Sequence, residues 1–221
     1  MTKKITLLIL SFVLFAPCFA QKSKVKKSKA QHIEFNSDVE GSILQFTKLI
    51  NDGKTIATTP RYTLFFNGGV DVNYKISKPF KAYTGLYFKN IGLIDKYGDS
   101  LKIKRRMYTI GAPLGLKINV KENLKFKIGA DCNLVFNYKE KVFRNGDKSA
   151  KFNEFFSNKT PLFYPSIFAG IVVYKISISA NYYPYNFFNT NYNLYNKMDA
   201  KLLTISAGIH LDNQSNKKSK K

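Results

Sequence analysis

The feature that most constrains this chain is an alternation of apolar and polar side chains over fifteen residues, from Leu124 to Tyr138. Every second residue from Leu124 onward is apolar, and among the intervening residues only Val135 breaks the pattern. A strand sends successive side chains to opposite faces, whereas a helix would scatter these apolar residues around its circumference. The segment is therefore predicted to be a strand, and one far longer than the usual length of about five or six residues.

Seven further segments complete the pattern. Two of them, 61–76 and 108–120, alternate as clearly, and the less regular ones are 32–47, 80–94, 162–174, 176–185 and 199–211. Tilted strands of about nine or more residues are long enough to cross a bilayer. An even number of antiparallel strands lets a sheet close with both termini on one side. We therefore predict an all-β fold: an eight-stranded antiparallel up-and-down transmembrane β-barrel of the outer-membrane type.

The connections between the predicted strands alternate in length. Long ones around 51–53, 95–100, 139–161 and 186–198 alternate with short turns near 77–79, 121–123 and 174–175. Outer-membrane barrels combine short periplasmic turns with longer external loops. Aromatic spacing agrees, because Tyr62 and Tyr74 lie twelve residues apart on one apolar face. That separation corresponds to about 30 Å across a membrane.

The amino terminus has the layout of a secretory signal peptide: Lys3 and Lys4, an apolar run over 5–16, and a small-residue site ending at Ala20. The apolar run is too short for a transmembrane anchor, and the residues before Cys18 do not favour acylation as a lipoprotein. We expect a signal peptide at 1–20, a basic periplasmic tail at 21–31, the barrel domain at 32–211 and a basic tail at 212–221. The expected location is the outer membrane of a Gram-negative cell.

The chain is strongly basic. Without Lys3 and Lys4 it holds 34 basic and 14 acidic residues, a net charge of about +20, and nine of the positive charges lie in the two tails. Such tails are expected to meet anionic outer-membrane lipid, lipopolysaccharide or an anionic cell-wall polymer. No nucleic-acid-binding module is visible. After export only Cys132 remains, on the apolar face of its strand, so no intrachain disulfide can form.

The interior of an eight-stranded barrel is filled by its own side chains. The face opposite the apolar rows carries acidic and basic residues together: Glu34, Asp38, Glu40, Arg61, Asp71, Lys75, Lys117, Lys125, Lys127 and Asp131. Buried charges are costly unless they are paired, so we expect a plug of paired, hydrogen-bonded charges that blocks diffusion. An ion or solute site in the lumen is the alternative.

No catalytic, cofactor-binding or metal-binding motif is visible in the sequence. The two histidines, His32 and His210, are both expected at the periplasmic ends of neighbouring strands, as a surface pair without a third metal ligand. Function is therefore expected in the external loops, whose aromatic residues are Phe143, Phe152, Phe155, Phe156, Tyr185, Phe187, Phe188, Tyr192 and Tyr195. They would form either a contact surface for glycan, lipopolysaccharide or protein, or an upper aromatic girdle at the membrane rim.

Several segments resemble one known family. The segment from Tyr108 to Lys117 (YTIGAPLGLK) is similar to a strand motif of the PorT-like outer membrane β-barrel proteins. The segments 126–131, 167–172 and 203–211 are similar to its later strands. The family tends to finish on an aromatic residue, whereas Leu211 is followed here by a lysine-rich tail. The resemblance implies an eight-stranded membrane barrel and no defined activity.

These observations favour a structural or surface-binding barrel of the outer membrane without catalysis. An accessory part of a secretion or transport assembly is the alternative that the PorT-like resemblance permits. A soluble lipocalin-like carrier would need apolar residues inside its barrel. The segment 124–138 sets lysines and Asp131 on the face opposite its apolar row, so a carrier would require an inverted barrel.

Overall fold

The structure, a computed structural model, describes residues 33–212. The expected signal peptide, the tail at 21–31, His32 and residues 213–221 of the second tail lie outside the described residues. The described strands are β1 (Ile33–Asn51), β2 (Lys54–Thr58), β3 (Arg61–Lys75), β4 (Phe80–Tyr97), β5 (Leu101–Lys121), β6 (Leu124–Arg144), β7 (Asp147–Phe155), β8 (Ser166–Val173), β9 (Ile176–Tyr183) and β10 (Met198–Asp212). A short 3₁₀ helix, η2 (Asn193–Tyr195), precedes β10. Within residues 33–212 no helix has the length and apolar character needed to span a membrane.

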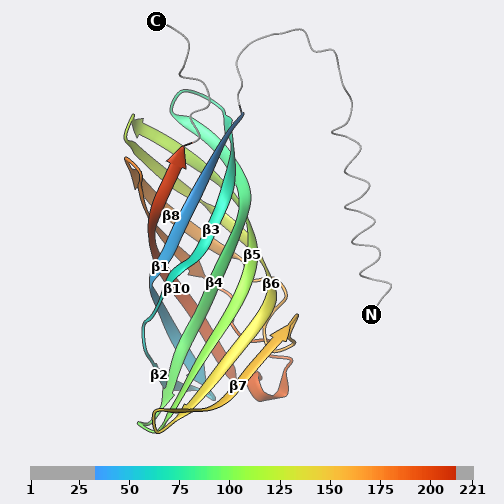
Figure 1. Cartoon of the computed structure of the whole chain (residues 1–221). Helices are drawn as coiled ribbons and strands as arrows, with labels where there is room; N and C mark the ends of the chain where they lie inside the picture. The colour runs from blue at the N-terminus through green and yellow to red at the C-terminus, as the bar shows by residue number, and fades with distance from the viewer. Residues whose placement is uncertain (1–32, 213–221) are drawn as a thin grey trace, which may run out of the picture. The chain divides into compact units, whose positions relative to one another are not determined.

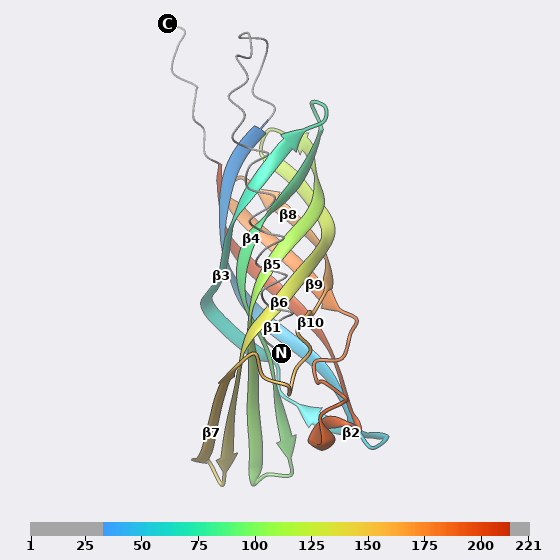
Figure 2. The same ribbon diagram turned by 90° about the vertical axis from the view of Figure 1, so that its right-hand side faces the viewer.

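Eight of these strands form a closed antiparallel ring. Its order is β1, β3, β4, β5, β6, β8, β9 and β10, and β10 returns to pair with β1 from Asn36↔Asp212 to Asn51↔Met198. Figures 1 and 2 show the strands tilted around a common axis, with the start of β1 and the end of β10 at one end. We call this the proximal end and the opposite one the distal end. The predicted all-β ring of eight antiparallel strands is confirmed.

At the distal end the structure corrects the prediction of long irregular loops. Residues 48–51 continue β1, β2 covers 54–58, and the expected loop 139–161 holds the end of β6 and all of β7. Tight turns make the reversals, with positive φ at Asp52 (50°) and Gly53 (74°), and at Asn145 (48°) and Gly146 (92°). Two successive residues with positive φ define the hairpin turn that matches strand twist. The wall therefore extends as β-sheet at three of the four expected long loops, whereas 186–197 is an irregular connection that holds only η2.

A β-bulge in β6 reverses which side chains face inward. Tyr108 pairs with Asn137 and Thr109 with Val135, so Phe136 is an extra residue. Before the bulge Val135 is buried inside, and after it Tyr138 is buried inside. The sequence prediction placed Tyr138 on the outer apolar row and was wrong, because one inserted residue shifts the alternation by one position. The same shift turns Lys139 and Lys141 to the outer face.

The outer surface carries a broad apolar band. Its most exposed side chains on the middle strands include Leu86 (57 %), Leu114 (74 %) and Ile128 (55 %). Toward the distal end the band finishes in four aromatic residues, which we call the aromatic belt: Phe88, Tyr108, Phe136 and Phe155. Their ring centroids lie 6.0 Å (Phe88 to Tyr108), 5.6 Å (Phe88 to Phe136) and 6.5 Å (Phe136 to Phe155) apart. Aromatic girdles of this kind mark the membrane–water boundary of a barrel.

Side chains complete the wall where β3 separates from β4. The backbone pairing of these strands ends at Gly68↔Phe88. Beyond it the Gln45 side chain donates to the Asn90 carbonyl (2.9 Å) and accepts from the Gly92 amide (3.0 Å). The Asn67 side-chain oxygen accepts from the Asn90 amide at 2.9 Å. An unsatisfied backbone group in a barrel wall costs several kcal/mol, about as much as a lost hydrogen bond in an apolar medium. The side-chain amides of Gln45 and Asn67 therefore supply the hydrogen bonds that a neighbouring strand would otherwise make.

A depth measurement tests the assignment of the apolar band. Cys132 is exposed on the outer face, and in a Cys18→Ser background it is the single thiol of the chain. A fluorophore on Cys132 in a reconstituted bilayer should be quenched by brominated lipids and protected from a water-soluble quencher. The matched control is Lys104→Cys in a background with Cys18→Ser and Cys132→Ser. Position 104 is on the outer face beyond the aromatic belt, and its fluorophore should show the opposite preference. Equal quenching of both positions by the aqueous quencher would contradict a membrane-spanning band.

Candidate functional site

Ion pairs cross the lumen in successive layers. Lys117 contacts Asp71 at 2.5 Å, and both side chains are almost fully buried. Tyr87 donates its hydroxyl to the second oxygen of Asp71 at 2.7 Å, and the Lys117 ammonium lies 4.6 Å from the centre of the Tyr83 ring. A buried charge is stable only when it is paired and hydrogen-bonded, which this layer achieves with residues from three strands.

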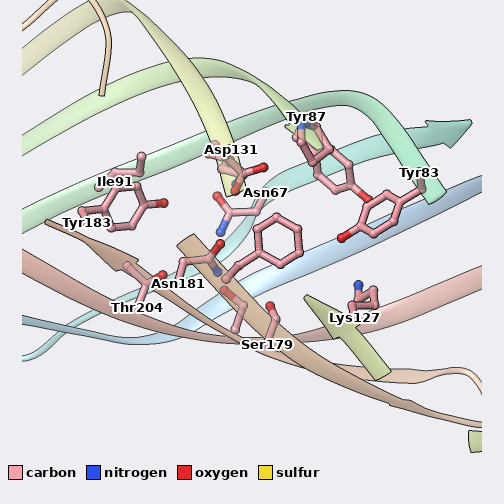
Figure 3. A pocket seen from close by; sticks show the side chains of 14 residues that line it. Asn67, Tyr83, Tyr87, Ile91, Lys127, Asp131, Ser179, Asn181, Tyr183 and Thr204 are labelled. Atoms are coloured by element: carbon pink, nitrogen blue, oxygen red, sulfur yellow. The ribbon is translucent and has the colours of Figure 1, made fainter. Parts of the chain in front are cut away.

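A second layer lies nearer the distal end. Lys89 contacts Asp131 at 2.5 Å, and Ser166 donates to the same carboxylate at 3.3 Å. Beside it lies a cavity of about 50 Å³, lined by residues that include Asn67, Tyr183 and Asn181. Figure 3 shows side chains from several strands around this space. Such a cavity has room for a few water molecules and is far smaller than the pockets of about 300 Å³ or more that hold organic ligands.

The remaining predicted lumen residues differ in how far they are buried. Glu34 meets Lys81 at 2.5 Å near the proximal end, with 42 % of its side chain exposed. Lys127 is buried, Lys125 is half-buried and Lys75 is exposed. Lys75 therefore lies outside the interior, since it is the last residue of β3 and is followed by the turn to β4. The side chains of Asp38 and Glu40 lie outside the described part of the chain.

Arg61, predicted in the charged lumen network, is buried within the wall, and its hydrogen-bond partners are neutral. It donates to the Gln45 side-chain oxygen at 2.5 Å and to the Asn90 side-chain oxygen at 2.8 Å. A Cβ at Gly92 would lie 3.1 Å from the Arg61 Nη1 and 2.2 Å from the Arg105 carbonyl oxygen. Glycine is needed at position 92 because any side chain there would meet the neighbouring strand and displace this guanidinium. Arg61 thus seals the wall beside Gln45.

The distal end of the lumen holds a third charged cluster. Arg105 pairs with Asp95 and, at 3.0 Å, with Glu140. Glu140 also accepts hydroxyl hydrogen bonds from Tyr138 (2.7 Å) and Tyr195 (3.1 Å). Burial opposes the charge of Arg105, but Asp95 and Glu140 outweigh it and hold the guanidinium pKa above its usual value. Burial would raise the pKa of Glu140, yet Arg105 and the Tyr138 hydroxyl outweigh it and lower that pKa.

Aromatic residues of the last connection fold into the distal end and close it. Phe187 (0 % exposed), Phe188 (2 %) and Tyr195 (5 %) join Tyr164 in the buried cluster, and we call these four residues the aromatic plug. The Arg105 guanidinium lies 5.3 Å from the centre of the Phe188 ring, so the plug covers the charged cluster. The Asn186 side chain anchors the segment by donating to the Met198 carbonyl (2.6 Å) and accepting from the Ala200 amide (2.9 Å).

The predicted loop surface is therefore corrected in part. Phe187, Phe188 and Tyr195 are internal, because their rings fill the space above Arg105. Phe143, Phe152 and Tyr192 are half-buried, and the Lys159 ammonium lies 3.6 Å from the centre of the Phe152 ring. The exposed members are Phe155 (66 %), Phe156 (63 %) and Tyr185 (60 %). Phe155 stacks on Phe136 in the aromatic belt, which corresponds to the girdle alternative at that residue.

Several residues of these clusters were not found from the sequence. Lys89 lies on a strand whose alternation was too irregular to be read in full. Asp95 and Glu140 lie in segments predicted as loops, and Arg105 lies between the predicted loop 95–100 and the predicted strand 108–120, so no inner face was assigned to them. The Asn145-Gly146 pair, a strong hairpin signal, would have revealed that strand pairing continues through this region.

Within residues 33–212, no group of three His, Cys, Asp or Glu side chains could hold a metal ion. His210, predicted at the surface, is instead buried (1 % exposed), and its backbone amide donates to the Lys175 carbonyl. Its partner in the predicted pair, His32, lies outside the described residues.

Comparison with known families decides the class of the protein. A model described as outer membrane protein beta-barrel domain matches residues 19–216. The chain belongs to this outer membrane β-barrel family. Family membership indicates the cell outer membrane as its location. Such barrels have short periplasmic turns and longer external connections. The short turns β3–β4, β5–β6 and β8–β9 lie at the proximal end, so the distal end is the external one.

Solved structures similar to this outer membrane barrel have low sequence identity. Ail, the attachment invasion locus protein of Yersinia pestis, is 11 % identical with a TM-score of 0.41, over 80 % of this chain and 99 % of Ail. Neisserial surface protein A is 14 % identical with a TM-score of 0.39, over 84 % of this chain and 99 % of that protein. A search of curated proteins found no match.

Breaking the distal charged cluster should be strongly destabilising. Arg105→Leu leaves Asp95 buried without its cation, which typically costs about 3–5 kcal/mol. Unfolding of the refolded barrel in urea would measure this loss. Lys197→Leu is the matched control, because Lys197 and Asp52 form a pair at 3.1 Å with 63 % and 70 % of their side chains exposed. The control should lose under about 1 kcal/mol, and similar losses for both variants would contradict a central role for Arg105.

The lowered pKa of Glu140 predicts how stability depends on pH. A carboxyl with a depressed pKa in the folded state contributes stability that is complete above its ordinary pKa of 4.5. That contribution is lost as the pH falls from this value through the lowered pKa of the folded protein. The transition temperature of the wild type should therefore exceed that of Glu140→Gln at neutral pH, and the gap should narrow in acid. A gap that widens in acid would have the wrong sign for this assignment.

Proposed function

We propose that this protein is a non-enzymatic outer membrane barrel that is closed to free diffusion and acts by binding at its external surface. The observation that carries the proposal is the filled lumen. Two buried ion-pair layers lie beneath the Arg105 cluster, and the aromatic plug covers that cluster. The extended walls of β4, β5, β6 and β7 stand on the external side and present their outer faces to whatever the protein meets.

The arrangement of polar groups supports binding without catalysis. Lysine, carboxylate and tyrosine groups of the lumen are engaged with one another, as Asp71 is with Lys117 and Tyr87. A reacting substrate would need access to such groups, and the cavity beside them has a volume of only about 50 Å³. A general acid or base must reach within hydrogen-bonding distance of its substrate.

Conductance measurements in a planar bilayer test whether the lumen is closed to ions. The refolded full chain in a planar bilayer should give no stepwise currents. Phe187→Ser with Phe188→Ser should also stay closed, because the layers around Asp71 and Asp131 remain. Adding Lys89→Ala with Asp131→Ala, and Asp71→Ala with Lys117→Ala, removes both partners of each layer, which avoids leaving an unpaired charge, and leaks should then appear. Regular conductance steps from the unmodified protein would overturn the closed-barrel function.

A second candidate is an accessory role in a secretion or transport assembly, which the resemblance to PorT-like proteins suggests. The edge of β7 favours it: within the described sheet β7 pairs with β6 alone, and most of its residues are exposed. An exposed strand edge can accept a strand from another chain. A pull-down that retains a stoichiometric envelope protein with wild type and loses it with Ala150→Pro would support this role. Absence of any stoichiometric partner would argue against it.

A further inference from the structure

The outer face of the external wall changes from apolar to basic just beyond the aromatic belt. The cross-strand register places Arg106 beside Lys139, and Lys104 beside Lys141, which in turn neighbours Lys151. Directly paired residues on one face have their Cβ atoms about 4.5–5.5 Å apart. We use the term cationic strip for these residues and their neighbours: Lys102, Lys104, Arg106, Lys139, Lys141, Lys148 and Lys151.

The direction of these side chains follows from burial on the opposite face. Arg105 and Met107 of β5 are buried inside, so Lys104 and Arg106 lie on the outer face. On β6, Tyr138 is buried inside, and the bulge at Phe136 turns Lys139 outward. Without that bulge the lysines of β6 would face the lumen, so the strip depends on one inserted residue.

Carboxylates do not neutralise this strip. Among residues 33–212, none of the ion pairs involves a member of the strip. Asp95 of β4 and Glu140 of β6 face inward and pair with Arg105. The acidic residues of β7 are not opposite strip residues in register, because Glu154 pairs with Tyr138 and Asp147 with Arg144. Close behind the strip lies the buried guanidinium of Arg61, whose hydrogen-bond partners are neutral side chains.

Crowding of like charges has an electrostatic consequence. Burial and the neighbouring cations Lys102, Arg106 and Arg61 lower the pKa of Lys104. Burial, Arg106 and the nearby lysines lower the pKa of Lys141. Like charges placed directly opposite each other on a sheet are destabilising. An anion bound across the strip would relieve this repulsion.

The position of the strip indicates the source of that anion. Arg106 and Tyr108 are successive outer-face residues of β5, so the cations begin about 7 Å beyond the aromatic belt. Below the belt lie exposed aliphatic side chains, including Leu86 (57 %) and Leu114 (74 %). A ligand that contacts both surfaces has apolar chains in the membrane and negative charge at its boundary. Phosphates of an acylated glycolipid in the outer leaflet have this arrangement.

A hollow on the same face extends the strip outward. It has a volume of about 380 Å³, and its lining includes Lys96, Lys102, Lys104, Phe143 and the turn residues Gly98 and Asp99. Lys102 lies six residues beyond Tyr108, or about 20 Å along the strand. The hollow therefore lies at the height of the sugar that follows a lipid head group, and its three lysines outnumber its one carboxylate, Asp99, so further negative charge suits it.

We propose that the cationic strip binds the phosphate groups of an outer-leaflet glycolipid whose acyl chains lie along the aromatic belt. This inference rests on the proposed surface-binding function and names its ligand. Arg106 and Lys139 contact the phosphate nearest the membrane. Lys104, Lys141 and the hollow beyond them contact the more distant negative charge.

The test uses the refolded full chain in detergent micelles and lipid A as the probe, in bisphosphorylated, monophosphorylated and dephosphorylated forms. Binding should weaken in that order. Arg106→Gln combined with Lys139→Gln and Lys141→Gln should weaken binding of the bisphosphorylated form by at least about tenfold, since a hydrogen bond to a charged group corresponds to roughly that factor. The matched control, Lys75→Gln with Lys121→Gln and Lys175→Gln, removes three exposed periplasmic charges and should leave binding unchanged.

Other outcomes would overturn the inference. Equal affinity for phosphorylated and dephosphorylated lipid would exclude phosphate recognition. Equal loss in the control variant would show an effect of net charge alone. Tight binding of sucrose octasulfate, a soluble polysulfated sugar, that lipid A fails to displace would assign the strip to a soluble polyanion. Heat-dependent migration in SDS gels verifies that each variant is folded. Conductance of the same preparations separates the closed-barrel function from the lipid site. A conducting barrel that still discriminates between phosphorylated and dephosphorylated lipid would contradict closure but support the lipid site.

Discussion

The requirement that every backbone amide and carbonyl in a membrane find a partner within the protein governs this structure. Strand pairing around the ring, which the pairing of β1 with β10 closes, meets that requirement over most of the circumference. Where β3 leaves β4, the Gln45 and Asn67 side chains bond to the backbone of Asn90 and Gly92. Once the ring is closed, alternation assigns each remaining side chain either to lipid or to the narrow interior. The paired charges, the aromatic belt and the cationic strip all follow from that division.

Much of the fold could be predicted because alternation is a local property of the sequence. The outer row from Leu124 to Phe136 and the long strands around it were visible without any tertiary information. The wall beyond the belt was not, because its outer face is basic and its inner face mixes aromatic with charged residues. Lys104 and Arg105 are both cations, yet one faces outward and the other is buried, so polarity carries no periodic signal there. The bulge at Phe136 then reversed the alternation inside the predicted strand, two residues before its expected end at Tyr138.

The candidate site shows the same limit. Asp71, Lys117 and Asp131 could be assigned to the interior from the alternation of their strands, and the structure places them there. Their partners could not be named, because pairing across a barrel depends on register and tilt. The aromatic residues of the last connection were recognised as important, but composition alone could not distinguish an exposed surface from a plug. In the structure, the hydrogen bonds of the Asn186 side chain to Met198 and Ala200 anchor this connection at the start of β10, and its aromatic residues form a plug.

The external walls are continuous sheet and turn sharply at Asn145 and Gly146. A binding surface built on flexible loops loses conformational entropy when its ligand orders it, at about 1–2 kcal/mol for each backbone residue fixed. The cations of β5 and β6 are already held in register by the ladder that continues from the membrane. Only side-chain rotamers remain to be ordered on binding, so modest individual contacts can add up to useful affinity. The length of these strands thus gives the barrel a preorganised surface at a fixed height above the bilayer.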